Sequence, residues 1–117
     1  MSTKNTQPET AGAQPDNVRE EIKSITVIGK RWFDKINGNT YHSAQTLVNG
    51  KPGPAVSFRY GYGNQFEWEA EAELERAGFI QPEHYKNGGR ESLWRYCDER
   101  NIAYTVFVSD VSRKRDL

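Results

Sequence analysis

The chain has 117 residues, enough for one domain of ordinary size and too few for two. Its 16 basic and 16 acidic residues cancel, which excludes a bulk attraction to nucleic acid or to an anionic membrane and leaves only local charged patches. The single cysteine, Cys97, excludes an intrachain disulfide, and the two histidines lack zinc-ligand spacing, so we expect no metal and no cofactor. The sequence shows no apolar leader and no long apolar run, which predicts a cytoplasmic protein without a membrane segment.

The two ends of the chain are polar. Residues 1–23 hold prolines and many small polar side chains and cannot bury enough apolar surface to order themselves, which predicts a disordered tail. Residues 113–117 are also polar, and we expect them to be frayed. A single domain over residues 24–112 remains.

The domain begins with a predicted hairpin. Residues 24–34 are rich in β-branched and aromatic side chains, as is typical of a strand, and residues 40–48 form the return strand. Between them lies Asn37-Gly38, which favours a tight type I′ turn. A two-residue turn at this place pairs Val27 with Val48.

The remaining elements follow from changes in the hydrophobic period. In residues 55–60 apolar and polar positions alternate, which predicts a third, half-buried antiparallel strand. Residues 65–77 change to a helical period, and a second, shorter helix is expected over residues 90–100. The predicted inward-facing side chains are Phe66, Ala70, Leu74 and Ala77 in the first helix and Leu93, Trp94 and Cys97 in the second. Residues 103–109 are strongly β-prone and predict a buried strand that joins the sheet.

This order, β-β-β-α-α-β, indicates an α+β domain. We expect a mostly antiparallel sheet with two helices packed on one face.

The predicted hairpin and the strand after it bring cations and rings together. Rings can stack on bases while Lys and Arg meet phosphates, so the pattern suggests a nucleic-acid-binding face. The candidate residues are Lys30, Arg31, Trp32, Lys35, Tyr41, His42, Arg59 and Tyr62. The alternative interpretation is a half-buried sheet whose rings belong to the core and whose charges are solvated.

The first predicted helix suggests a second kind of partner. Glutamates occupy every second position from 67 to 75, and Trp68 lies opposite the apolar stripe. An acidic surface with an exposed indole suits a basic protein partner, such as a host defence protein that the chain would inhibit. The candidates are Glu67, Trp68, Glu71 and Glu75; the alternative is a plain solvated helix.

The segment from Tyr60 to Asn64 suggests a third interpretation. Its glycines permit close backbone approach to a ligand, and Asn64 precedes a predicted helix. A small-ligand or nucleotide site there would use Tyr60, Tyr62, Arg59 and His42; an ordinary strand-to-helix connection is the alternative.

Several segments resemble a family of small uncharacterised proteins found in bacteriophage and prophage genomes. They are residues 27–35 (VIGKRWFDK), 38–43 (GNTYHS), 60–63 (YGYG), 92–97 (SLWRYC) and 109–111 (SDV). The resemblance implies an accessory role during infection or lysogeny, in nucleic-acid metabolism or against a host defence system, and implies no mechanism.

No set of acid, base, nucleophile and metal ligand converges in the sequence, so we expect a non-enzymatic binding or modulator protein with no catalytic residues. Nucleic acid and a host protein are the expected partners, and a homo-oligomer is a third, since a net charge of zero favours self-association.

Overall fold

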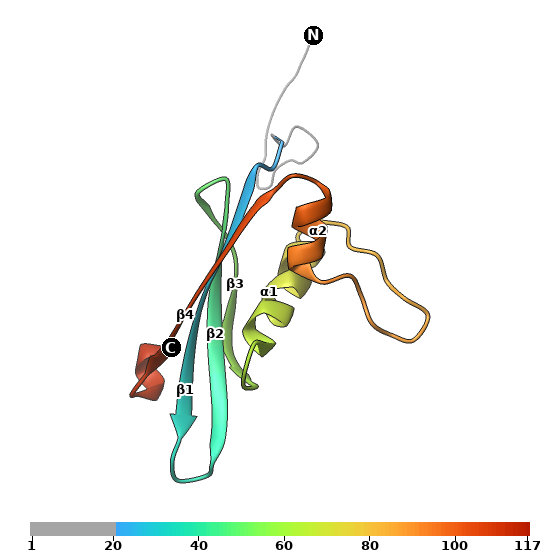
Figure 1. Ribbon diagram of the computed structural model, residues 1–117. Coiled ribbons are helices and arrows are strands. Elements are labelled where there is room, and N and C mark those ends of the chain that lie inside the picture. Colours follow the sequence, from blue (N-terminus) through green and yellow to red (C-terminus); the bar gives the residue numbers. More distant parts are fainter. Residues whose placement is uncertain (1–20) are drawn as a thin grey trace.

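A computed structural model describes residues 21–117, so the tail predicted over residues 1–23 lies almost wholly outside the described residues (Figure 1). The elements are β1 (Ser24–Asp34), β2 (Asn39–Val48), β3 (Lys51–Tyr60), α1 (Gln65–Arg76), α2 (Leu93–Glu99), β4 (Ala103–Val111) and the short 3-10 helix η2 (Lys114–Asp116).

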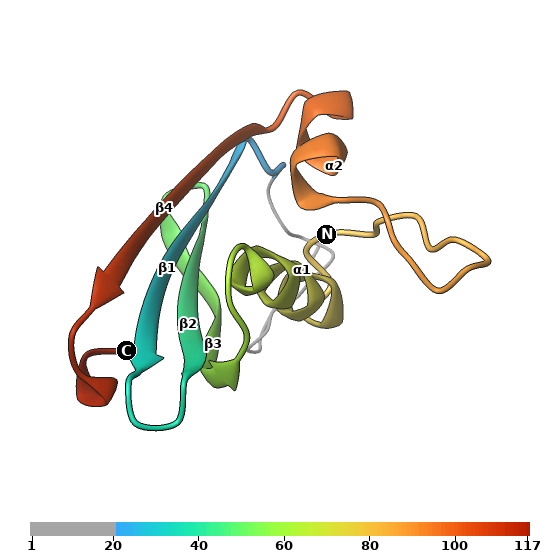
Figure 2. The same cartoon turned by 60° about the horizontal axis from the view of Figure 1, so that its bottom comes forward.

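The four strands form one sheet in the order β3-β2-β1-β4. Neighbouring strands are antiparallel except β4, which runs parallel to β1. The two α-helices lie on the same side of this sheet, leaving its other side without an α-helix (Figure 2). The predicted α+β fold and element order are therefore confirmed. We call the side that carries α1 and α2 the helix face and the other side the open face.

The register of the first hairpin differs from the predicted one by two residues: Ile25, not Val27, lies opposite Val48. The reason is the turn. The Asp34 carboxylate accepts hydrogen bonds from the backbone N–H groups of Ile36 and Asn37, and the Gly38 N–H donates to the Asp34 carbonyl. This wider turn replaces the two-residue one. Because side chains alternate with period two, a shift of two leaves each residue on its predicted face.

The core fills the space between the helix face and the two helices, α1 and α2. Ile25 and Val27 of β1 are fully buried there, under Ala70 and Leu74 of α1. Further along β1, Gly29 has no side chain, and the Phe66 ring occupies that space: an added Cβ would lie 2.4 Å from the ring's Cδ2 atom. Gly29 therefore lets α1 approach the sheet closely.

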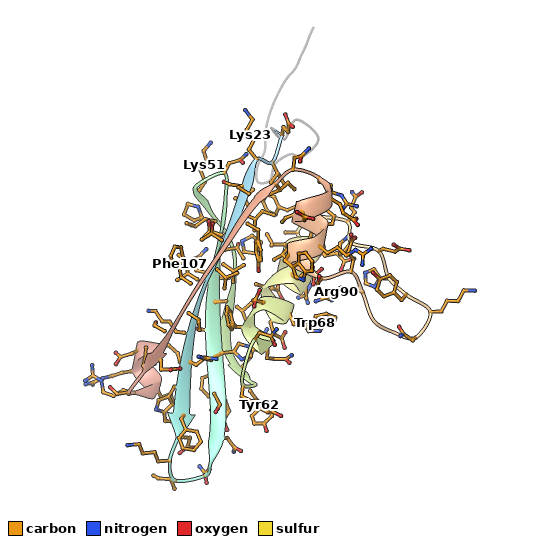
Figure 3. All side chains as sticks on the ribbon, in the orientation of Figure 1. Lys23, Lys51, Tyr62, Trp68, Arg90 and Phe107 are labelled. Atoms are coloured by element: carbon orange, nitrogen blue, oxygen red, sulfur yellow. The ribbon has the colours of Figure 1, made fainter. Side chains whose placement is uncertain are left out.

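Three details of the predicted core are wrong. Trp94 is 61% exposed and Tyr96 is buried instead, because α2 begins at Leu93 and its inward stripe is Leu93, Tyr96 and Cys97. Ala77 lies beyond the end of α1 and is exposed. The last strand is not buried but forms an edge of the sheet, with Phe107 exposed on the open face (Figure 3).

The chain's last residues are ordered against the sheet rather than frayed. Residues Lys114–Asp116 form η2, and the Arg113 guanidinium pairs with the Asp116 carboxylate at 2.9 Å. The Lys114 Nζ atom lies 4.9 Å from the centroid of the Phe58 ring. The segment that follows β4 therefore folds back over β3 on the open face.

Candidate nucleic-acid interface

Strand alternation divides the predicted hairpin residues between the two faces of the sheet. In β1, Arg31 lies opposite the buried His42 on the helix face, whereas Trp32 lies opposite Tyr41 on the open face. Lys30 shares the open face with Trp32 and is exposed. The eight candidates therefore do not make a single site.

Four aromatic rings cross the open face from β1 to β3. We call Trp32, Tyr41, Phe58 and Tyr60 the aromatic ladder. The Trp32 and Tyr41 centroids lie 5.9 Å apart with 26° between the planes, and those of Tyr41 and Phe58 lie 4.6 Å apart with 16° between the planes. Tyr60 meets Tyr41 edge-on at 5.8 Å and 75°. Such offset-stacked and edge-to-face pairs stabilise the arrangement by about 0.5–1.5 kcal/mol each beyond area burial.

The ladder has an accessible end at β3. Trp32 and Tyr41 are half-buried within the row, whereas Phe58 is 41% and Tyr60 61% exposed. One face of the Phe58 ring stacks on Tyr41, and the Lys114 ammonium lies over the ring as well. A cation held against a ring is a contact that water and other ligands can displace at small cost.

A groove with basic walls adjoins this end of the ladder. It has a volume of about 640 Å³ and is lined by Ser43, Ser57, Phe58, Arg113, Lys114, Arg115 and Leu117. Three of those seven residues carry a positive charge, and of them Arg113 is paired with Asp116. An exposed ring beside several cations can bind a planar group that carries negative charge.

Five of the eight predicted binding residues lie away from the ladder, and three of these five are in the strands. His42 is 1% exposed, with Nδ1 3.2 Å from the Gly61 carbonyl, so the prediction that it meets a ligand is wrong for this conformation. Arg31 is held on the helix face by the Asp110 carboxylate at 3.2 Å and the Gly63 carbonyl at 3.1 Å. Arg59 is exposed and pairs with His42 in the sheet register, which also directs it toward the helix face.

The other two of these five candidates, Lys35 and Tyr62, lie in the connections between elements. Lys35 is in the exposed turn between β1 and β2. Tyr62 projects from the connection between β3 and α1, away from the open face (Figure 3). Of the eight candidates, the structure thus brings together Lys30, Trp32 and Tyr41.

The predicted acidic surface is interrupted in its middle. The Glu71 carboxylate is buried, and its Oε1 atom lies 3.2 Å from Nε of Arg90. The same guanidinium donates to the Trp68 carbonyl and stands 4.3 Å from the Trp68 ring centroid (Figure 3). Burial raises the pKa of Glu71, and the Arg90 charge and hydrogen bond oppose that rise. Glu71 and Trp68 therefore both already contact Arg90 of the same domain.

Two other acidic candidates also have partners within the chain. The Tyr104 hydroxyl of β4 donates to the Glu67 carboxylate at 2.8 Å. The His84 ring lies 2.6 Å from the Glu75 carboxylate. These contacts tie α1 to β4 and to the long connection before α2, which gives the carboxylates a structural role.

The connection between β3 and α1 adjoins a hollow of about 440 Å³, but its lining differs from that of the predicted small-ligand site. Its lining is Arg31, Phe33, Lys35, Thr40, Tyr62, Gly63, Asp110, Val111 and Ser112. Of the residues predicted for a small-ligand site only Tyr62 is present, because Tyr60 lies on the open face and His42 is buried. Of the two cations in this lining, Arg31 is already paired with Asp110.

Sequence reasoning missed Phe58, Tyr60 and the basic C-terminal residues as parts of the site. Strict alternation places Val56, Phe58 and Tyr60 on one face, but the pairing of β3 with β2 shifts between His42 and Ala44. That bulge leaves Val56 in the core while Phe58 and Tyr60 turn to the open face. The run of three basic residues at 113–115 was the available signal for the groove.

Within residues 21–117 no helix is long and apolar enough to cross a bilayer, and no group of three or more potential metal ligands is present in that range. No family model, no curated protein and no solved structure matches the chain.

Proposed function

We propose that this protein is a non-enzymatic module that binds single-stranded nucleic acid on its open face, acting in the cytoplasm as an accessory protein of the bacteriophage type that its sequence resembles. The observation that supports the proposal is the exposed end of the aromatic ladder, Phe58 and Tyr60, beside the basic groove.

A base stacks on the exposed surface of Phe58 and displaces the Lys114 ammonium from the ring. Because Lys114 is on a short segment next to that ring, its charge stays close enough to meet the phosphate of the same nucleotide. Tyr60, edge-on to Tyr41, offers a second ring for the neighbouring base. Stacking of this kind accepts every base, since each base has a π face.

Single strands are favoured over duplexes for a geometric reason. In a duplex the bases stack on one another, and their faces are closed to protein rings. The ladder presents ring surfaces and no row of donors or acceptors for base edges, so we expect little sequence preference.

The experiment is a fluorescence-anisotropy titration of the full chain with labelled single-stranded DNA, single-stranded RNA and duplex DNA at low salt. Binding to the single strands that weakens as salt rises is the expected result. The matched pair of variants is Tyr60→Ala and Trp94→Ala, because both side chains are 61% exposed and only Tyr60 belongs to the ladder. We expect Tyr60→Ala and Phe58→Ala each to weaken binding by about 5- to 150-fold, in line with about 1–3 kcal/mol per stacked base, and Trp94→Ala to leave it unchanged.

Two results would refute the proposal. One is the absence of binding to any of the three oligonucleotides at low salt. The other is an equal loss for Tyr60→Ala and Trp94→Ala, which would place the contact elsewhere or reveal nonspecific adhesion. Circular dichroism of each variant checks that the fold is retained.

A further inference from the structure

The two edges of the sheet are built differently. At one edge, β3 carries Lys51, Pro52 and Pro54, and its pairing with β2 contains two irregularities. Prolines, charges and bulges are the features by which natural sheets prevent pairing with another chain. The β3 edge is therefore protected.

The β4 edge has no proline and no bulge, and its one charged residue, Asp110, lies next to its end. Its sequence, AYTVFVSDV, holds no proline and no basic residue, and it pairs with β1 without interruption over nine residues. No described residue pairs with its outer side, which lies open in both ribbon views (Figures 1 and 2). A long, regular edge of this kind presents a row of backbone donors and acceptors that another strand can use.

We propose that β4 pairs antiparallel with β4 of a second copy of this chain, about a two-fold axis at Phe107. In that register Phe107 lies opposite its own counterpart on the open face. The other pairs are Val106 with Val108, Thr105 with Ser109, Tyr104 with Asp110 and Ala103 with Val111. Aromatic and β-branched residues placed opposite one another stabilise strand pairing.

Charge also favours a second copy as the occupant. Asp110 is the one charged residue in β4, and in this register it faces Tyr104 rather than another carboxylate. It is also paired with Arg31 of its own chain, so its charge is already balanced. The chain as a whole has a formal net charge of zero, and two copies do not repel each other at long range.

The exposed apolar side chains of β4 would then be covered. Phe107 is 58% exposed on the open face, and Val108 on the helix face is also exposed. The two-fold axis joins the sheets side by side with their open faces on the same side. The inference is independent of nucleic-acid binding, because Phe107 lies outside the aromatic ladder.

The experiment measures the mass of the full chain by sedimentation equilibrium over concentrations from about 1 μM to about 1 mM, the range in which moderate self-association is detected. We expect a dimer. Phe107→Lys and Phe107→Glu each place like charges opposite one another at the axis, and each should raise the dissociation constant at least about tenfold. An equimolar mixture of the two should regain the dimer, because Lys then faces Glu. Ile36→Lys, at the exposed tip of the first hairpin, is the charge-matched control and should leave the dimer intact.

A cysteine at the axis tests the register. Phe107→Cys places two cysteines opposite each other with Cα atoms about 4.5–5.5 Å apart, within the range that a disulfide spans, so mild oxidation should cross-link the copies. Cys97 is buried and does not compete. A wild-type chain that stays monomeric over the whole concentration range overturns the proposal. So does a dimer that Ile36→Lys weakens as much as the Phe107 variants do, or an equimolar mixture of Phe107→Lys and Phe107→Glu that fails to form the dimer. A dimer in which Phe107→Cys does not cross-link overturns the proposed register.

Discussion

The Phe66 ring of α1 lies directly over Gly29 of β1, in the space where any other residue would carry its side chain. This contact sets how closely α1 approaches the sheet and thereby the depth of the core beneath it.

Gly29→Ala should therefore destabilise the domain. The added methyl group would lie 2.4 Å from the Phe66 ring, and relief requires a shift of the ring or of α1. We expect a loss of about 1–3 kcal/mol in the free energy of unfolding, measured by urea denaturation. Gly89→Ala is the control, with its nearest neighbour the Asn87 Oδ1 atom at 3.3 Å, and should change stability by less than about 0.5 kcal/mol. The double variant with Phe66→Leu should lose less than the sum of the single changes; strict additivity would contradict the contact.

The Cys97 thiol should be unreactive in the folded protein, and its ionisation should lower the free energy of unfolding as pH rises above about 9. Burial raises the pKa of its thiol to about 12, from an ordinary value of 9.0. Because the folded state favours the protonated thiol, this stabilisation is complete below pH 9 and is lost as pH rises toward 12. Between about pH 9 and 10 the loss approaches about 1.4 kcal/mol per pH unit.

Two measurements check this prediction. A thiol reagent at neutral pH should label Cys97 only when denaturant is added. In urea denaturation, the free energy of unfolding should decline less steeply between about pH 9 and 10 for Cys97→Ala than for the wild type. Burial also raises the pKa of Tyr104, but Tyr104 contributes most at higher pH. Rapid labelling of the native protein would contradict the buried environment.

Arg90 and Glu71 should behave as a coupled pair. Arg90→Ala leaves the buried Glu71 carboxylate without its cation and should cost about 3–5 kcal/mol. Glu71→Ala should cost less, because Arg90 keeps the Trp68 carbonyl and ring as partners. In a double-mutant cycle by urea denaturation the double variant should be more stable than the sum of the two single losses implies. Independent effects would show that the ion pair contributes nothing.

Lys114 should contribute to affinity through phosphate contact and not through the fold. We expect Lys114→Ala to reduce the slope of log affinity against log salt by about 0.7, the contribution of one phosphate contact on a single strand. Lys86→Ala, in the exposed connection before α2, is the matched control and should leave the slope unchanged. An unchanged slope for Lys114→Ala would remove the C-terminal segment from the binding surface.

The parts of the fold that were predictable are those with a strong local pattern. Alternation in residues 24–34 and 40–48, and the stripe that contains Phe66 and Leu74, gave the strands, the first helix and its buried face correctly. The hairpin register was not predictable from Asn37-Gly38 alone, since the Asp34 side chain competes for the turn's backbone N–H groups.

The site was only half predictable for a similar reason. Alternation in β1 and β2 implies that Trp32 and Tyr41 share a face, but which face the helices cover depends on the whole sheet. The bulge that turns Phe58 outward arises from pairing with β2 and leaves no mark in the local pattern. Lys114 reaches the ladder because β4 runs parallel to β1, so that β4 ends at Val111 beside Trp32 and residues 112–117 begin next to the ladder.

The strand order has a consequence for synthesis on the ribosome. β1 is made first among the strands, yet one of its two edges is completed only by β4, whose last residue is Val111. The hairpins and α1 can form while the chain is still emerging, but the sheet cannot be completed until β4 has emerged as well. During that interval the backbone of β1 is available for mispairing, and a prematurely terminated product would keep that defect permanently.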